Sequence, residues 1–166
     1  MEIAQLVLNN PKIMGSLIAI AFDVDNPISS RACWVMEYTA KENLSILYPH
    51  LDLITSKLGS VYLDSSVRPI AKICECLLTV YYSGRGENIR SVMNEEHLKR
   101  MTTACFDWLI SEQKVAAKAY SMTCLYLLGK KFDWIHPELK MVITQNYASG
   151  SAAYKARARK IMAKLP

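Results

Sequence analysis

The fold is indicated by a pattern that occurs four times, in SRACWVMEYTA (30–40), SVRPIAKICECLL (66–78), AAKAYSMTCLYLL (116–128) and AYKARARKIM (153–162). Each copy has a basic residue near its start and then apolar residues at the spacing of one helix face. Another helical segment precedes each copy, so the repeating unit is a helix pair of about 37 residues. Units of this size stack and bury a shared core. The sequence therefore predicts an all-α fold, an α-solenoid of about four helical hairpins.

Capping residues divide the chain into these pairs. Asn10 and Asn26 each precede a proline and are expected to cap helices at about 11–23 and 27–42. The other helices are expected at about 44–58, 67–81, 95–109, 115–128, from Pro137 to a turn at 149–151, and from there to Leu165.

Two further signals separate the second pair from the third. Asn94 is expected to cap the third pair, and Gly129 to end it. Residues 83–93 (SGRGENIRSVM) contain two glycines and no sustained helical period, so an exposed loop is expected there. We interpret this loop as an insertion into the repeat.

Length and composition favour a single folded domain over residues 1–166. Hydrophobic residues make up 51% of the chain, and the 6 glycines and 6 prolines are too few for a disordered protein. The N-terminus does not have the basic and then apolar pattern of a secretion signal. The longest apolar run, 17–22, is far too short to span a membrane. A cytoplasmic protein without a membrane partner is expected.

Neither a metal nor a cofactor is expected. The five cysteines lie within apolar helical patterns, and the three histidines are scattered. The pair Cys74 and Cys76 has no second ligand cluster, so we interpret the cysteines as buried, reduced thiols.

The charge is unevenly distributed. Residues 1–113 carry 10 Lys and Arg against 13 Asp and Glu, and residues 114–166 carry 10 against 2. The net charge of +5 therefore comes from the C-terminal part. This asymmetry predicts either an acidic partner for that part or a solvated basic cap at the end of the stack.

The helix pairs, with a basic residue near the start of each second helix, resemble HEAT repeats. The segments SRACWVMEY and GSAAYKARARKIM also resemble a group of small bacterial HEAT-like proteins without an assigned biochemical role. The resemblance covers nearly the whole chain. It implies that the second helices line a concave face, and that this face holds a peptide, a helix or a nucleic-acid backbone.

The sequence shares some features with two enzyme families. HEAT-like DNA glycosylases of the alkylation-repair type have a basic channel with aromatic residues and one carboxylate. The residue types for such a site are present in Asp107–Trp108, Asp133–Trp134, Arg31, Arg68, Lys118 and Arg157. An adenylosuccinate lyase is not supported, because Arg68 replaces the methionine of the loop motif S-S-x-M-P-x-K-x-N, and Ala71 and Ile73 replace its Lys and Asn.

The basic residues of the second helices have two interpretations. Arg31, Arg68, Lys118, and Lys155 or Arg157 suit a phosphate backbone, because guanidinium forks match phosphate oxygens. Alternatively they form ion pairs between repeats and contact helix-end carbonyls, which we favour. The last helix carries a basic face of its own, which either binds an acidic partner or serves as a solvated cap: Arg157, Arg159, Lys160 and Lys164.

The tryptophans are the remaining candidates. Trp34 and Trp108 lie close to apolar stripes and are expected in the core. Trp134 precedes Ile135 at a turn between helices, where it either contacts a partner or stabilises the turn.

No set of residues defines a catalytic site, so enzymatic activity stays open and is not favoured. We expect a non-catalytic binding or scaffold module that holds a protein or peptide on the concave face. The alternative is a nucleic-acid-binding protein that uses the basic C-terminal half, as a degenerate relative of the glycosylases.

Overall fold

The computed structural model describes residues 2–166, which form ten α-helices, three short 3-10 helices and no β-strand. The predicted all-α fold is therefore confirmed. The α-helices are α1 (Glu2–Asn9), α2 (Met14–Ala21), α3 (Ser29–Glu42), α4 (Leu51–Lys57), α5 (Asp64–Tyr81), α6 (Glu87–Val92), α7 (Glu95–Ile110), α8 (Val115–Leu128), α9 (Ile135–Tyr147) and α10 (Ala152–Met162). The 3-10 helices are η1 (Pro11–Ile13), η2 (Leu44–His50) and η3 (Leu58–Ser60).

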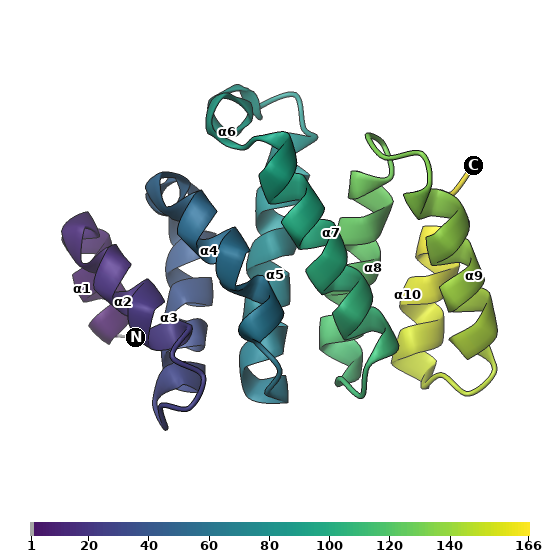
Figure 1. The fold of residues 1–166 in the computed structure, drawn as a ribbon, viewed down its shortest axis with the longest axis horizontal. Helices are drawn as coiled ribbons and strands as arrows, with labels where there is room; N and C mark the ends of the chain where they lie inside the picture. Colours follow the sequence, from purple (N-terminus) through teal and green to yellow (C-terminus); the bar gives the residue numbers. More distant parts are fainter. Residues whose placement is uncertain (1) are drawn as a thin grey trace.

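The helices lie in two layers (Figure 1). The first-helix layer, nearer the viewer, consists of α2, α4, α7 and α9. The second-helix layer behind it consists of α3, α5, α8 and α10, and each of these helices contacts the next. The helix α1 packs against α3. This order places the second helix of every expected pair on one side of the molecule.

The core lies between the two layers. Side chains such as Met36, Ile54, Ile70, Leu77 and Leu125 are fully buried there. They come from the apolar stripes of the sequence, and full burial of each such side chain contributes roughly 1.5–3 kcal/mol. The repeated apolar pattern therefore supplies the contact between neighbouring helices.

The segment 83–93 differs from its expected conformation. Its residues Glu87–Val92 form the short helix α6, with Ile89 and Met93 buried in the core. The expected exposed loop is therefore wrong for this part. Six residues are too few for a helical period to be recognised. The loop was therefore predicted from the two glycines that precede them.

The capping predictions had mixed outcomes. Asn94 caps α7 as predicted, since its side chain accepts a hydrogen bond from His97 N while His97 Nδ1 accepts one from Asn94 N. The side chain of Asn10 makes no capping bond, and Asn26 accepts a hydrogen bond from Ile28 N. Gly129 follows the last residue of α8, as predicted.

A proline inside α5 creates a contact that the sequence pattern did not predict. Pro69 has no N–H, so it leaves the carbonyl of Ser65 without its usual partner in the helix. Trp34 Nε1 of α3 donates to this carbonyl at 3.0 Å. The indole is 48% exposed, so the expected core position of Trp34 is wrong, whereas Trp108 is buried as predicted.

No single helix among residues 2–166 has the length and apolar character needed to cross a membrane. One bent pair of helices in this range, Glu2–Asn9 with Pro11–Ala21, has that length and apolar character when taken together, with a bend of 110° between its two parts.

Candidate functional site: the face of the second helices

The second-helix layer carries the net charge of the protein. Its four helices contain nine Lys and Arg against four Asp and Glu, whereas the rest of the chain has eleven of each. The layer therefore has the full excess of +5. The positive charge of the protein is therefore concentrated on one side of the molecule.

The first polar cluster joins α3 to α5. Glu37 is nearly buried, with its side chain 3% exposed, and it accepts hydrogen bonds from Lys41 and from Arg68, the latter at 2.9 Å. The guanidinium of Arg68 also lies 4.3 Å from the centre of the Trp34 ring, a cation–π contact. Two cations share one carboxylate, so the cluster keeps one positive charge.

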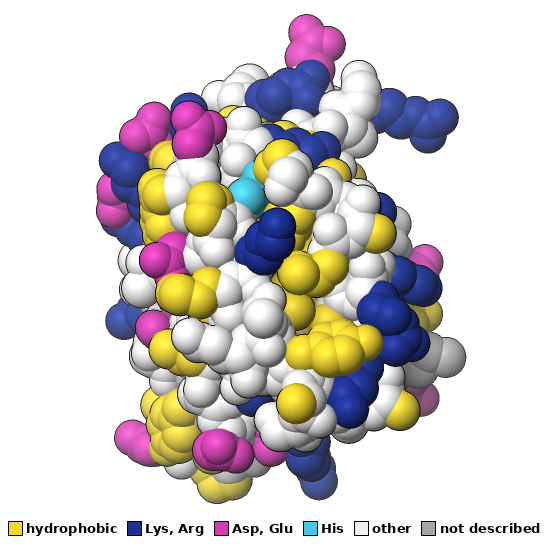
Figure 2. Space-filling view, turned by 90° about the vertical axis from the view of Figure 1, so that its right-hand side faces the viewer, with side chains coloured by type: hydrophobic (Ala, Val, Ile, Leu, Met, Phe, Trp, Pro, Cys, Tyr) yellow, Lys and Arg dark blue, Asp and Glu magenta, His cyan; other side chains and the backbone are white. Residues whose placement is uncertain are grey.

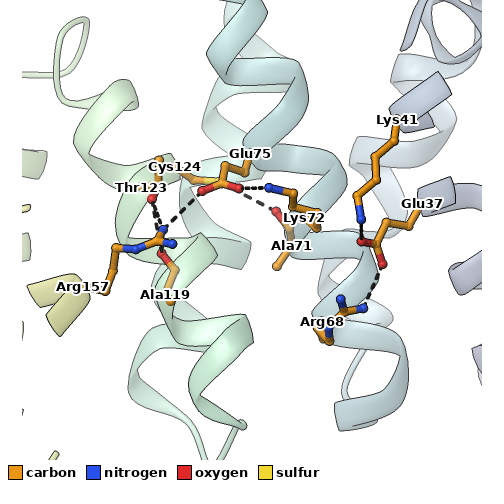
Figure 3. A network of polar contacts seen from close by, with 10 residues as sticks. All are labelled: Glu37, Lys41, Arg68, Ala71, Lys72, Glu75, Ala119, Thr123, Cys124 and Arg157. Atoms are coloured by element: carbon orange, nitrogen blue, oxygen red, sulfur yellow. Dashed lines mark hydrogen bonds and ion pairs between the residues drawn. The ribbon is translucent and has the colours of Figure 1, made fainter. Parts of the chain in front are cut away.

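The second cluster repeats this design one helix further along. Glu75 of α5, 11% exposed at its side chain, pairs with Lys72 at 2.6 Å and with Arg157 of α10 at 3.3 Å. Arg157 reaches across α8, where it donates to the carbonyl of Ala119 and to Thr123 Oγ1 (Figure 3). The second cluster therefore links three helices of the layer.

The pKa of Lys72 follows from this environment. Partial burial acts to lower the pKa of the Lys72 ammonium. The hydrogen bond and charge of Glu75 outweigh that effect and raise the pKa above its usual value. Lys72 is thus a permanent cation at neutral pH, and it lies 4.9 Å from the centre of the Tyr120 ring.

The four basic residues predicted to suit a phosphate backbone differ in whether they have an ion-pair partner. Arg68 and Arg157 form ion pairs between helices, which is the alternative favoured from the sequence. Arg31 of α3 is exposed and Lys118 of α8 is half-buried, and neither pairs with a carboxylate of residues 2–166. The four residues therefore do not form one uniform row of free cations.

The last helix has free basic residues. Lys160 is exposed and has no ion-pair partner within residues 2–166. Lys155 and Arg159 contact Tyr147, through a ring contact of 5.8 Å and a hydrogen bond of 3.1 Å to its hydroxyl. Seen from the C-terminal end, Lys and Arg side chains form a band along the right-hand side of the molecule (Figure 2).

The second-helix layer contains two hollows. The α8/α10 hollow has a volume of about 390 Å³ and is lined by Val115, Ala116, Ala119, Tyr120, Ala153, Ala156, Arg157 and Lys160. The α3/α5 hollow has a volume of about 440 Å³ and is lined by Ala40, Lys41, Leu44, Lys72, Glu75, Cys76, Thr79 and Val80. In both, small or aliphatic residues lie beside two cations. These hollows were not predicted, because they depend on how neighbouring helices are spaced.

Trp134 lies at a different site. It is 55% exposed, stacks on Phe106 at 5.7 Å, and lines a hollow of about 270 Å³ together with Lys99, Thr102, Thr103 and Phe132. Neither Asp107 nor Asp133 is part of that lining. The aromatic residue and the carboxylate that a glycosylase site combines are therefore not brought together in this hollow.

The cysteines differ in exposure. All five are free, and Cys76 is the only one that is not fully buried. Burial raises the pKa of the Cys76 thiol above its usual value, so it is a weak nucleophile at neutral pH. No group of three potential metal ligands is formed by the residues the structure describes.

Comparisons of this chain with models of protein families, with curated proteins and with solved structures found no match.

Proposed function

We propose that the protein is a non-catalytic binding module whose second-helix layer holds an acidic segment of a protein partner. The observation that carries the proposal is the charge of this layer, +5 in a protein whose remaining residues have no net charge. The two hollows beside cationic residues give such a segment places to dock. The architecture in this proposal is an α-solenoid of four HEAT-like hairpins, with the second helices on its concave side.

The paired arginines favour a protein over a nucleic acid. A phosphate backbone is bound by several free cations in a row. Arg68 and Arg157 are already paired with carboxylates, and the aromatic rings of Trp34 and Tyr120 are already covered by cations. One face of each ring is therefore occupied by a cation and is not available for stacking on a base.

Nucleic-acid binding is the second candidate function. It is supported by α8 and α10, which together carry five Lys and Arg and no Asp or Glu. A nucleic acid would then be contacted only by the C-terminal half of the protein.

One titration separates the two functions. Fluorescence anisotropy compares a labelled 15-residue polyglutamate peptide with a labelled 20-base-pair DNA duplex over a salt series. The proposed function expects the peptide to bind at low salt and to be weakened by a charge reversal at Lys160. Failure of the peptide to bind at low salt overturns the proposal. Binding of the duplex alone, with a steep salt dependence, establishes the second candidate instead.

The matched control is a charge reversal at Lys140. This residue is an exposed lysine of α9, in the first-helix layer. The substitution Lys140→Glu changes the net charge by the same amount as Lys160→Glu. A peptide that binds to the second-helix layer is affected less by Lys140→Glu than by Lys160→Glu.

A further inference from the structure

We infer that the acidic partner segment carries two apolar side chains, each flanked by acidic residues, and that these side chains occupy the α8/α10 hollow and the α3/α5 hollow. The inference rests on the proposed function, which it refines from a charge preference to a pattern of anchors.

The α8/α10 hollow combines an apolar floor with a basic rim. Four of its lining residues are alanines, which expose methyl groups and leave room for a larger side chain. Arg157 and Lys160 lie at the same hollow, and no Asp or Glu lines it. An aliphatic side chain gains from leaving water there, and a carboxylate next to it meets the unpaired Lys160, whereas Arg157 is already held by Glu75.

The α3/α5 hollow has the same design with a weaker charge. Ala40, Leu44 and Val80 provide apolar surface, and the cations are Lys41 and Lys72, which pair with Glu37 and Glu75. Glu75 also lines this hollow, but its carboxylate is held by Lys72 and Arg157. One positive charge remains, so this hollow binds an acidic segment less strongly than the other.

The two hollows belong to one surface. The first lies between α3 and α5, the second between α8 and α10, and α5 contacts α8 directly. Neighbouring helix axes are about 8–10 Å apart, which places the hollows on the order of 20 Å from each other. A helical partner spans this distance with about 13 residues, at 1.5 Å per residue, and an extended one with about 6.

Synthetic peptides test the anchors. The first probe is the blocked pentapeptide Glu-Glu-Leu-Glu-Glu, and its control has Ser in place of Leu, so the charge is identical. Binding is followed by chemical-shift changes in ¹H–¹⁵N spectra of the whole protein. We expect the Leu peptide to shift residues of both hollows and to bind at least threefold more tightly than the Ser peptide.

The outcomes separate this inference from the proposed function. Equal binding of the Leu and Ser peptides to the second-helix layer overturns the two-anchor inference and leaves the proposed function standing. If polyglutamate and both pentapeptides fail to bind, the proposed function fails, and the inference fails with it. Shifts confined to the first-helix layer contradict both.

A second experiment tests whether the hollows act together. Two copies of the Leu peptide are joined by a flexible Gly-Ser linker long enough to span 20 Å, and we expect at least tenfold tighter binding than for one copy. The substitution Ala156→Leu fills the α8/α10 hollow and is expected to abolish that gain. Ala163→Leu, at an exposed residue that does not line the hollow, is the control and leaves the gain intact.

Cys76 reports on the other hollow. It lines the α3/α5 hollow and is the only cysteine of the chain that is not fully buried. Occupation of this hollow is expected to slow alkylation of Cys76 by iodoacetamide at least threefold, in the wild type and in Ala156→Leu alike. An unchanged rate at a saturating concentration of the two-copy peptide overturns the assignment of this hollow.

Discussion

The two halves of the second-helix layer differ in how their charges are balanced. The helices α3 and α5 contain four Lys and Arg and four Asp and Glu, whereas α8 and α10 contain five and none. In the first half, Glu37 and Glu75 hold Lys41, Arg68 and Lys72 in polar clusters, and only Arg31 has no carboxylate partner among residues 2–166. In the second half only Arg157 has a carboxylate partner, and that partner belongs to α5.

The comparison teaches that one sequence pattern serves two purposes. A basic residue near the start of a helix tightens the contact between helices when a buried carboxylate faces it, as at Arg68. The same pattern leaves a cation without an ion-pair partner when no carboxylate faces it, as at Lys118. The difference lies in the neighbouring helix, so it cannot be read from one repeat alone.

The largest expected effect comes from reversing charge in the second half. The triple variant Lys155→Glu, Arg159→Glu and Lys160→Glu is expected to weaken polyglutamate binding about 100-fold at low salt, since each reversal costs roughly 1 kcal/mol or more. Arg31→Glu in the first half is expected to change it less than threefold. Anisotropy titrations measure both. Equal losses for the two variants contradict the proposed difference between the halves.

Neutralising the buried carboxylates tests the balanced half. Glu75→Gln leaves Lys72 and Arg157 without their counter-charge, and we expect the free energy of unfolding to fall by about 1–3 kcal/mol. The same variant adds one positive charge to the layer, so its affinity for polyglutamate is expected to rise. Urea unfolding measures the first effect and anisotropy the second.

The control for this pair of effects is Glu112→Gln. Glu112 is an exposed residue between α7 and α8 and makes no ion pair within residues 2–166. Its neutralisation changes the net charge by the same amount and is expected to leave stability within about 0.5 kcal/mol of the wild type. A similar loss of stability in both variants shows that Glu75 has no special role.

The pH dependence of the free energy of unfolding in alkali tests the ion pair between Lys72 and Glu75. The pKa of Lys72 is raised in the folded protein, so its contribution to stability is present below the unfolded pKa of about 10.5 and is lost as the pH rises through the folded pKa. Lys72→Gln is expected to reduce the loss of stability above pH 10.5. Lys118→Gln, which removes a lysine without a carboxylate partner, is the control for the loss of one positive charge.

Urea titrations between pH 8 and 11.5 measure these slopes. The cysteines also ionise in the unfolded chain in this range, but they are present in both variants and do not affect the comparison between them. A parallel slope for Lys72→Gln and the wild type contradicts the pairing with Glu75.

The sequence was sufficient for the fold class and for most helices. Apolar spacing located the second helices well, because their buried faces follow a regular period over eleven residues or more. It failed for Glu87–Val92, which is too short to show a period, and for Trp34, whose apolar ring lies on the surface. A proline four residues after Ser65 does mark a free carbonyl, so the position of a donor to it was foreseeable in principle.

The candidate site was less predictable for a physical reason. Basic residues stand out in a sequence, but their ion-pair partners lie 31 residues away for Arg68 and 82 for Arg157. Nothing in the local pattern distinguishes Glu37 and Glu75 from solvent-exposed acids. Only the packing of the helices determines which cations are neutralised and which remain unpaired.

The smallest expected effect concerns the hydrogen bonds that join neighbouring second helices. In the first half, Trp34 Nε1 donates to Ser65 O, a carbonyl that Pro69 leaves without a helix partner. In the second half, Arg157 donates to Ala119 O, which also accepts a hydrogen bond from Thr123 Oγ1. Loss of a donor costs more where the acceptor has no substitute.

Trp34→Phe keeps an aromatic ring beside Arg68 but removes the donor, so we expect a loss of about 1 kcal/mol in the free energy of unfolding. Thr123→Val removes one of several donors to Ala119 O and one of three acceptors of Arg157, which keeps Ala119 O and Glu75, and it is expected to cost about 0.5 kcal/mol or less. Urea unfolding of both variants compares the two junctions. A cost for Thr123→Val that equals or exceeds that of Trp34→Phe means that the Ser65 carbonyl is satisfied by water as well as by the indole, because it lies near the surface.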